Sequence, residues 1–215
     1  MLSIQLHTLG KKFNKEWIFR DLSHSIPAGR KLLISGGNGS GKSTLLQVLS
    51  GFITPNEGNI LYNLNGTNVA VDEIKNHLSF ASPYLQLVEE FTLEELVEHI
   101  KIYKPFSSTL STNEFMSAIE LTNAKTKYIR QFSSGMKQRL KLGLAILSDT
   151  PLLLLDEPIS NLDKNAIDWY KQLVTAHSTN RTIIVCSNAL NDEHFFCDTE
   201  LVVSDFKPHS TNKNL

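Results

Sequence analysis

Residues 36–44 read Gly36-Gly37-Asn38-Gly39-Ser40-Gly41-Lys42-Ser43-Thr44, and this glycine-rich stretch decides the fold. A compact apolar segment, residues 31–35, comes directly before it, and apolar residues at helical spacing follow it as far as Gly51. The glycines allow the backbone to curl so that successive N–H groups point at phosphate oxygens, to which the positive end of the following helix also contributes. The order of strand, loop and helix therefore predicts a phosphate-binding loop and not an ordinary glycine-rich turn.

Two residues of this loop have side chains with distinct expected roles. Lys42 is expected to reach the β and γ phosphates of a nucleotide, and the Ser43 hydroxyl is expected to bind Mg²⁺, a hard ion that takes oxygen ligands. The residues predicted to contact the nucleotide here are Gly36, Gly37, Asn38, Gly39, Ser40, Gly41, Lys42, Ser43 and Thr44.

A second motif lies in the second half of the chain, where the four leucines of residues 152–155 lead into Asp156, Glu157 and Pro158. The pattern predicts a buried strand that ends in two carboxylates. We expect Asp156 to orient the Mg²⁺ shell and Glu157 to act as the general base that polarises water facing the γ-phosphate. An acidic turn that merely ends a core strand is the alternative, and the phosphate-binding loop makes it the weaker one.

The third motif is the segment Phe132-Ser133-Ser134-Gly135-Met136-Lys137-Gln138-Arg139-Leu140. A Ser-Ser-Gly turn that opens a helix offers free N–H groups and a hydroxyl to an anion, although serine-rich helix starts are also common as simple caps. The segment resembles the signature of the nucleotide-binding subunits of ATP-binding cassette (ABC) transporters, usually Leu-Ser-Gly-Gly-Gln followed by basic residues. It also stands between the loop and the acidic pair, as in that family, and the resemblance extends from about residue 4 to residue 203.

The resemblance implies further contacts with ATP, residue by residue. Ser134, Gly135 and Met136 would contact the ATP held by a second subunit, and Asp163 would lie in the segment of residues 160–163 that lines the joint between the two subunits. Phe13 stands where the family has an aromatic residue that stacks on adenine, and a core position on an edge strand is an equally good interpretation.

Two positions depart from the family pattern. Tyr84 stands where the family has a glutamine, with Gln86 two residues late, and Asn188 stands where the family has a histidine that contacts the γ-phosphate. An amide can donate a hydrogen bond to a phosphate oxygen but cannot become cationic near neutral pH. The resemblance therefore implies an Asn188 contact with ATP that is weaker in charge stabilisation and in proton handling.

Strands that alternate with helices predict an α/β fold with a parallel sheet covered on both faces. The apolar alternation at Leu2, Ile4 and Leu6 predicts short antiparallel strands at one edge. With the resemblance, we expect a single ABC-type P-loop ATPase domain over residues 1–215. Its core would comprise about 1–83 and 150–206, with an inserted α-helical subdomain at about 84–149 and a polar tail at 207–215.

Composition excludes several classes of function. The chain has 21 Lys and Arg against 22 Asp and Glu, a net charge of −1, so we expect no nucleic-acid partner. Its apolar runs of four residues are far shorter than the ~20 that cross a bilayer, and the N-terminus does not resemble a secretion signal. Two cysteines make no disulfide framework, so a cytoplasmic location is expected.

These observations and the resemblance predict an ATP-hydrolysing subunit of an ABC transporter that requires ATP and Mg²⁺. Two subunits, as a homodimer or as a heterodimer with another nucleotide-binding subunit, would face each other around two ATP. They would drive a separate transmembrane permease docked near residues 84–91, and so lie peripherally on the inner face of the membrane.

Two alternatives remain at this point. Tyr84 and Asn188 are compatible with a nucleotide-gated regulatory subunit that hydrolyses ATP very slowly, although Glu157 argues against it. A non-transport ABC ATPase acting on ribosomes or DNA ends is less consistent with the sequence. The chain has one cassette where ribosome-acting relatives have two, and the interval from Lys42 to Ser134 leaves no room for the long coiled coil of DNA-repair relatives.

Overall fold

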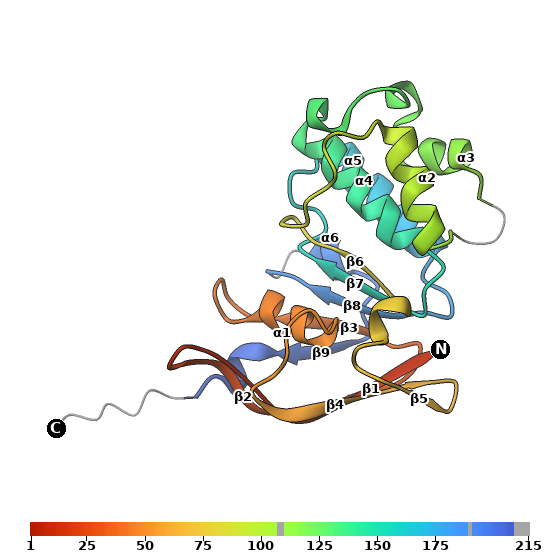
Figure 1. Cartoon of the computed structure of the whole chain (residues 1–215). Helices are drawn as coiled ribbons and strands as arrows, with labels where there is room; N and C mark the ends of the chain where they lie inside the picture. Colours follow the sequence, from red (N-terminus) through yellow and green to blue (C-terminus); the bar gives the residue numbers. More distant parts are fainter. Residues whose placement is uncertain (107–109, 189–190, 209–215) are drawn as a thin grey trace.

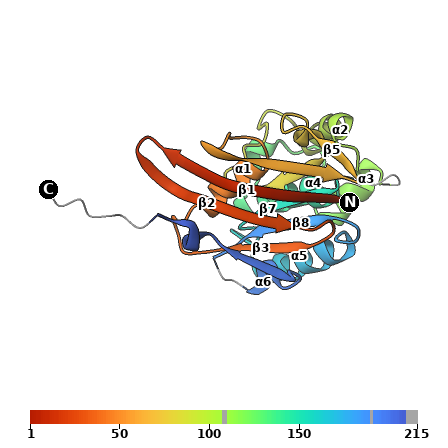
Figure 2. The same cartoon turned by 90° about the horizontal axis from the view of Figure 1, so that it is seen from below.

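A computed structural model of the chain describes residues 1–106, 110–188 and 191–208, and in it two sheets lie below a group of helices (Figure 1). The antiparallel sheet contains, in spatial order, β2 (Glu16–Ile26), β1 (Leu2–Phe13), β4 (Glu57–Leu64) and β5 (Thr67–Val69). Figure 2 shows β2, β1 and β4 side by side on the lower face of the molecule. The second sheet contains β6 (Leu78–Ala81), β7 (Leu152–Asp156), β8 (Thr182–Cys186), β3 (Lys31–Ser35) and β9 (Thr199–Val202), and all its pairs are parallel.

The helices are α1 (Lys42–Leu49), α2 (Leu93–Tyr103), α3 (Thr112–Ala118), α4 (Ser134–Ile146), α5 (Lys164–Ala176) and α6 (Asn191–His194). Short 3₁₀ turns complete the chain: η1 (Ile74–Asn76), η2 (Thr122–Ala124), η3 (Ile129–Gln131) and η4 (Val203–Phe206). None of the helices in the described part of the chain is long and apolar enough to cross a membrane.

The parallel sheet separates two hydrophobic cores, because successive side chains of a strand point to opposite faces. Leu152 and Leu154 of β7 pack with α1 and with the inner face of the antiparallel sheet. Leu153 and Leu155 pack on the other side, with α4, α5 and the helices above them. The continuous leucine run of β7 is therefore the pattern expected of a strand that is buried on both faces.

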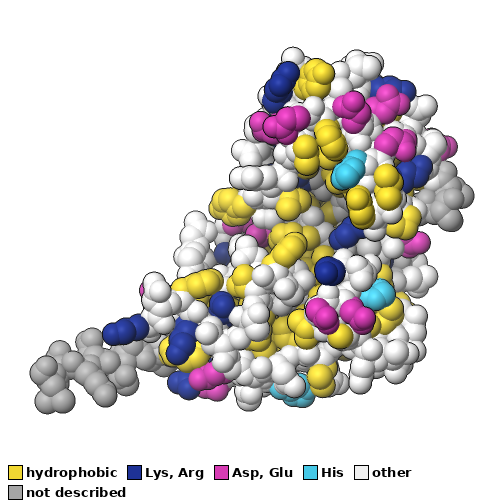
Figure 3. Space-filling model, in the orientation of Figure 1, with side chains coloured by type: hydrophobic (Ala, Val, Ile, Leu, Met, Phe, Trp, Pro, Cys, Tyr) yellow, Lys and Arg dark blue, Asp and Glu magenta, His cyan; other side chains and the backbone are white. Residues whose placement is uncertain are grey.

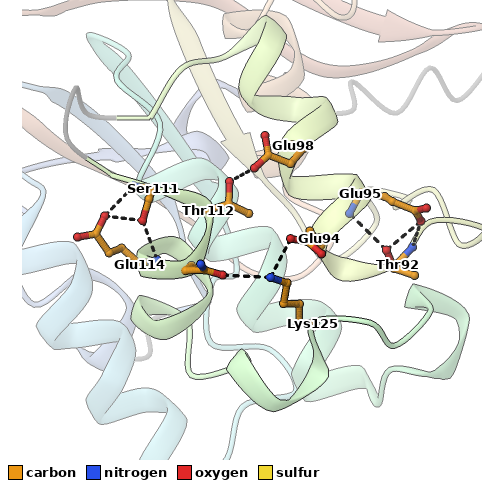
Figure 4. Close-up of polar contacts among 9 residues, drawn as sticks. Thr92, Glu94, Glu95, Glu98, Ser111, Thr112, Glu114 and Lys125 are labelled. Carbon is orange, nitrogen blue, oxygen red and sulfur yellow. Dashed lines mark hydrogen bonds and ion pairs between the residues drawn. The ribbon is translucent and has the colours of Figure 1, made fainter.

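The upper helices begin at well-defined caps (Figure 4). Thr92 and Glu95 form a capping box at the start of α2, and Ser111 and Glu114 form another at the start of α3. Lys125 then connects the two helices: its ammonium lies 2.9 Å from a Glu94 carboxylate oxygen and donates to the Asn113 side chain of α3 at 3.3 Å. These exposed pairs fix the orientation of the helices more than they add stability.

The lower end of α4 is held by a buried arginine. Arg181, just before β8, is 8% exposed, and its guanidinium donates to the carbonyl oxygens of Ile146 at 2.6 Å and of Thr150 at 2.8 Å. A positive charge is favourable at a helix C-terminus, where the carbonyl groups have no partners within the helix. Burial lowers the pKa of Arg181 to about 10, so the side chain remains charged at neutral pH.

The α/β class, the parallel core and the antiparallel edge are confirmed, and one detail differs from the expectation. The N-terminal strands are long, with 12 residues in β1 and 11 in β2, because register shifts between Leu6 and Lys12 allow pairing to continue through polar residues. Helices α2, α3 and α4 lie within the range expected for the helical insert. Of the expected polar tail, residues 209–215 lie outside the described residues.

Candidate functional site

A cleft of about 490 Å³ lies at the carboxyl ends of three neighbouring parallel strands. The glycine-rich loop follows β3, Asp156 and Glu157 end β7, and Asn188 follows β8. Carboxyl ends of parallel strands meet at one edge of a sheet, which is where open α/β sheets bind ligands. The cleft is lined by Ile18, Asn38, Gly39, Gly41, Lys42, Ser43, Thr44, Tyr84, Glu157 and Asn188.

The loop conformation requires glycine at position 41, directly before α1. Gly41 caps α1 with φ at 103°, and a Cβ atom there would lie 2.3 Å from Cγ2 of Ile18. No side chain caps α1 and its first turn has no acidic residue, so the backbone N–H groups at its start are available to an anion. Ser40 Oγ is also buried with no partner among the described residues.

The Lys42 side chain folds back onto the loop and does not extend into solvent. Its side chain is 5% exposed, and the ammonium donates to the carbonyl oxygens of Gly36 at 2.9 Å and Gly37 at 3.1 Å. It also donates to Oδ1 of Asn188. The only cation lining the cleft within the described residues thus lies among neutral acceptors, close to the N-terminus of α1.

Ser43 and Asp156, far apart in the sequence, are in contact here. Ser43 Oγ donates to Asp156 Oδ1 at 3.0 Å, and Ser82 Oγ donates to Asp156 Oδ2 at 3.3 Å. Burial raises the pKa of Asp156, and the hydrogen bond from Ser43 opposes this effect. Within the described ranges, no group of three or more His, Cys, Asp and Glu side chains is arranged to hold a metal ion by itself. One carboxylate and one hydroxyl fit Mg²⁺, which takes its remaining ligands from phosphate and water.

Glu157 and Asn188 form the far wall of the cleft. Glu157 adopts the left-handed backbone region with φ at 44°, and its N–H donates to the Cys186 carbonyl at 2.9 Å. Asn188 Nδ2 donates to Glu157 Oε1 at 2.7 Å, so the one amide connects Glu157 with Lys42. A non-glycine residue at positive φ stores strain and persists only where its surroundings hold it, which is common at functional sites.

Phe13 is not brought into the cleft. It ends β1 with its side chain 49% exposed, and the Lys11 ammonium lies 5.1 Å from its ring centroid. The ring is therefore not a core residue of an edge strand, and the apolar side chain that does line the cleft is Ile18. Tyr84 also lines the cleft, with 79% of its side chain exposed, whereas Gln86 does not.

Ser134, Gly135 and Met136 form the first turn of α4 and do not line the cleft of their own chain. Ser133 is the N-cap, accepting from the Met136 N–H at 3.2 Å, so the exposed Ser134 hydroxyl is not used for capping. Asp163 caps α5 by accepting from the Ala166 N–H at 2.8 Å.

The start of α4 is nevertheless connected to the cleft. Gly135 approaches the segment after Glu157 so closely that a Cβ atom would lie 3.4 Å from the Asn161 carbonyl oxygen. Gln138 of α4 donates to the Pro158 carbonyl at 2.8 Å, and Lys141 donates to the Pro83 carbonyl at 2.6 Å. Helix α4 thus contacts the segments after β6 and after β7, which both lead to the cleft.

Sequence reasoning missed Ile18 and Ser82. Ser82 could have been found, because it directly follows β6 at the sheet edge where the other polar residues gather. Ile18 lies on β2, in the other sheet, and no local pattern indicates its contact with Gly41.

Comparisons with known proteins agree with this arrangement. The family model described as ABC transporter matches residues 19–160. An uncharacterised ABC transporter ATP-binding protein of Bacillus subtilis, YybJ, is 28% identical over 98% of this chain and 96% of its own length. The cytochrome c biogenesis ATP-binding export protein CcmA of Xylella fastidiosa is 31% identical over 80% of this chain and 76% of its own.

Solved structures share the fold. A putative ABC transporter ATP-binding protein from Pyrococcus furiosus superposes with a TM-score of 0.77 at 20% identity, covering 96% of this chain and all of that one. A further solved structure, the ATP-binding subunit of an ABC transporter, gives a TM-score of 0.77 at 23% identity over 93% of this chain and 85% of its own.

Proposed function

The chain belongs to the ABC transporter family, whose ATP-binding proteins are transport ATPases, and on that premise we propose that it binds and hydrolyses ATP to drive a separate membrane permease. The observation that carries the proposal is the meeting of Lys42, Ser43 and Glu157 in one cleft, with Asp156 bonded to Ser43, although these residues come from two separate segments of the chain. A nucleotide-binding loop, a Mg²⁺ site and a general base are the parts that phosphoryl transfer to water needs.

The phosphates would be held by the loop, residues 36–44, through backbone N–H groups and the Lys42 ammonium. Lys42 must then leave Asn188 or share its protons with phosphate oxygens, and its three donors permit either. Ser43 and Asp156 would hold Mg²⁺, which when bound neutralises charge on the phosphates.

Glu157 would accept a proton from the attacking water. Its carboxylate is partly buried, faces the cleft, and is fixed by its own strained backbone and by the donated bond from Asn188. Because the Asn188 amide is neutral at every pH of interest, it can orient Glu157 without competing for the proton.

The exposed first turn of α4 supports a dimer. Ser134 and Gly135 offer a hydroxyl and helix N-terminal N–H groups to an anion, yet they lie outside the cleft of their own chain. In a head-to-tail pair, each first turn would complete the ATP site of the other subunit, with the Asp163 segment at the joint. The partner would be a second copy or another nucleotide-binding subunit.

An apolar groove supports a permease partner. A cavity of about 390 Å³ lies between β6, α2 and α4 and is lined in part by Phe52, Phe80, Leu85, Val88 and Tyr103. Figure 3 shows hydrophobic side chains gathered on this face of the molecule. Phe52 is 63% and Tyr103 is 73% exposed, which is unusual for side chains of this size. We infer that a permease segment docks here, which would hold the chain at the inner face of the membrane.

Slow hydrolysis in a regulatory subunit is the second candidate, and one observation favours it. A neutral amide occupies the cleft wall at residue 188, and it provides no cation for the transition-state charge.

Three forms of the purified chain test the proposal: the wild type, Lys42→Ala and Glu157→Gln. We expect the wild type to hydrolyse Mg-ATP, Lys42→Ala to lose ATP binding, and Glu157→Gln to bind ATP without turnover. If Glu157→Gln hydrolyses ATP at the wild-type rate, Glu157 is not the general base. ATP binding without any turnover, alone or with a permease in vesicles, would favour the regulatory candidate.

A further inference from the structure

A buried carboxylate that belongs to none of the predicted site residues lies beneath the cleft. Glu193 is on α6 and its side chain is 2% exposed. The Ser187 hydroxyl donates to its Oε2. The backbone of Glu193 is also fixed, because the Tyr170 hydroxyl donates to its carbonyl at 2.8 Å.

The donor belongs to the loop after β8, which forms part of the far wall of the cleft. Ser187 directly precedes Asn188, and its own N–H donates to the Ile34 carbonyl at 3.2 Å, at the end of the strand that leads into the glycine-rich loop. The Glu193 carboxylate therefore holds the residue next to Asn188, whose Nδ2 donates to Glu157 Oε1 at 2.7 Å.

The residue type matches this geometry. A carboxylate is an acceptor at both oxygens, so either one can take the Ser187 hydrogen bond, whereas an amide of the same shape has one acceptor and can present N–H to a donor. Burial raises the pKa of Glu193, and the hydrogen bond from Ser187 opposes that effect. A buried carboxylate is costly unless it is well hydrogen-bonded, so packing alone does not account for glutamate here.

We propose that Glu193 is a positioning residue for ATP hydrolysis, whose carboxylate holds the loop after β8 in the position from which Asn188 supports Glu157. It touches neither substrate nor metal and acts through Ser187. This inference rests on the proposed ATP hydrolysis, and it predicts that Glu193 affects turnover and not nucleotide affinity.

Glu193→Gln tests the proposal, with Asp192→Asn as the matched control. Asp192 is on the same short helix but is exposed and pairs with Lys171 at 2.5 Å, so the control makes the same change of charge away from the loops. For Glu193→Gln we expect kcat to fall by about tenfold or more, with the KM for Mg-ATP within about twofold of wild type, whereas the control keeps both. Ser187→Ala should lower kcat alone and add little in the Glu193→Gln background.

A second measurement does not depend on activity. In the nucleotide-free protein, hydrogen exchange of the Ser187 amide, which donates to the Ile34 carbonyl, should be faster in Glu193→Gln than in the wild type or in Asp192→Asn. If the wild type hydrolyses no ATP, the proposed function fails, while amide exchange still shows whether Glu193 holds this loop. If Glu193→Gln does not fold, Ser187→Ala provides the same kcat and KM comparison.

Three results would overturn the proposal. One is a wild-type kcat in a folded Glu193→Gln protein, and another is unchanged exchange at the Ser187 amide. The third is an equal loss of turnover and of ATP binding, which would indicate general damage to the cleft.

Discussion

Replacing Asn188 with leucine removes the amide between Lys42 and Glu157 while nearly keeping the side-chain volume. The Asn188 Nδ2 atom donates to Glu157 Oε1 at 2.7 Å, and a hydrogen bond to a charged group is worth about 1.5–3 kcal/mol. If that support is needed in the transition state, its loss slows the reaction by about 10- to 100-fold, since ~1.4 kcal/mol is a factor of ten. We therefore expect kcat for Asn188→Leu to fall by about 10- to 100-fold.

The assay is steady-state ATP hydrolysis at saturating Mg-ATP, with ATP affinity measured separately. Affinity should change little, because Lys42 keeps its bonds to the Gly36 and Gly37 carbonyls and the loop N–H groups are untouched. Asn191→Leu makes the same chemical change at an exposed position nearby and should behave as the wild type. A folded Asn188→Leu protein with kcat within twofold of wild type would refute the role given to this amide.

Three further predictions concern single residues. Asn188→His restores the residue that the family has there and should raise kcat; unchanged turnover, read in the same assay, would place the residue outside the reacting site. Gly41→Ala should abolish ATP binding measured by calorimetry, because φ is 103° and the new Cβ would lie 2.3 Å from Ile18, and retained affinity would contradict the loop geometry. Arg181→Met deprives two buried carbonyls of their donor and should lower the free energy of unfolding in urea by about 2–6 kcal/mol, at ~1–3 kcal/mol for each; a change below about 1 kcal/mol would contradict it.

The parts of the site that follow parallel strands could be predicted from the sequence. Lys42, Asp156 and Asn188 each come directly after or just beyond an apolar strand segment, and parallel strands bring such residues to one edge. The fold class followed from the same alternation of strands and helices. Local sequence was sufficient in these cases because the chemistry lies at the ends of regular elements.

The parts that depend on contacts between distant elements could not be predicted. Phe13 is exposed at the end of a long hairpin, whose register and bulges no pattern specifies, and its contact with adenine stays a prediction. Ile18 reaches the cleft from the other sheet. Glu193 is a single residue in a four-residue helix, and only the fold shows that the Ser187 hydroxyl donates to it.

The central claim is that two copies of this chain, or this chain and a related subunit, complete each other's ATP site. The most direct test is the rate of Mg-ATP hydrolysis per mole of purified chain as a function of its concentration, with Lys42→Ala as the blank. The account predicts a specific activity that rises with concentration, because the exposed Ser134 and the half-buried Gly135 of one copy would complete the cleft of another. Activity that is independent of concentration and survives in a Ser134→Arg protein, which cannot form that joint, would contradict it.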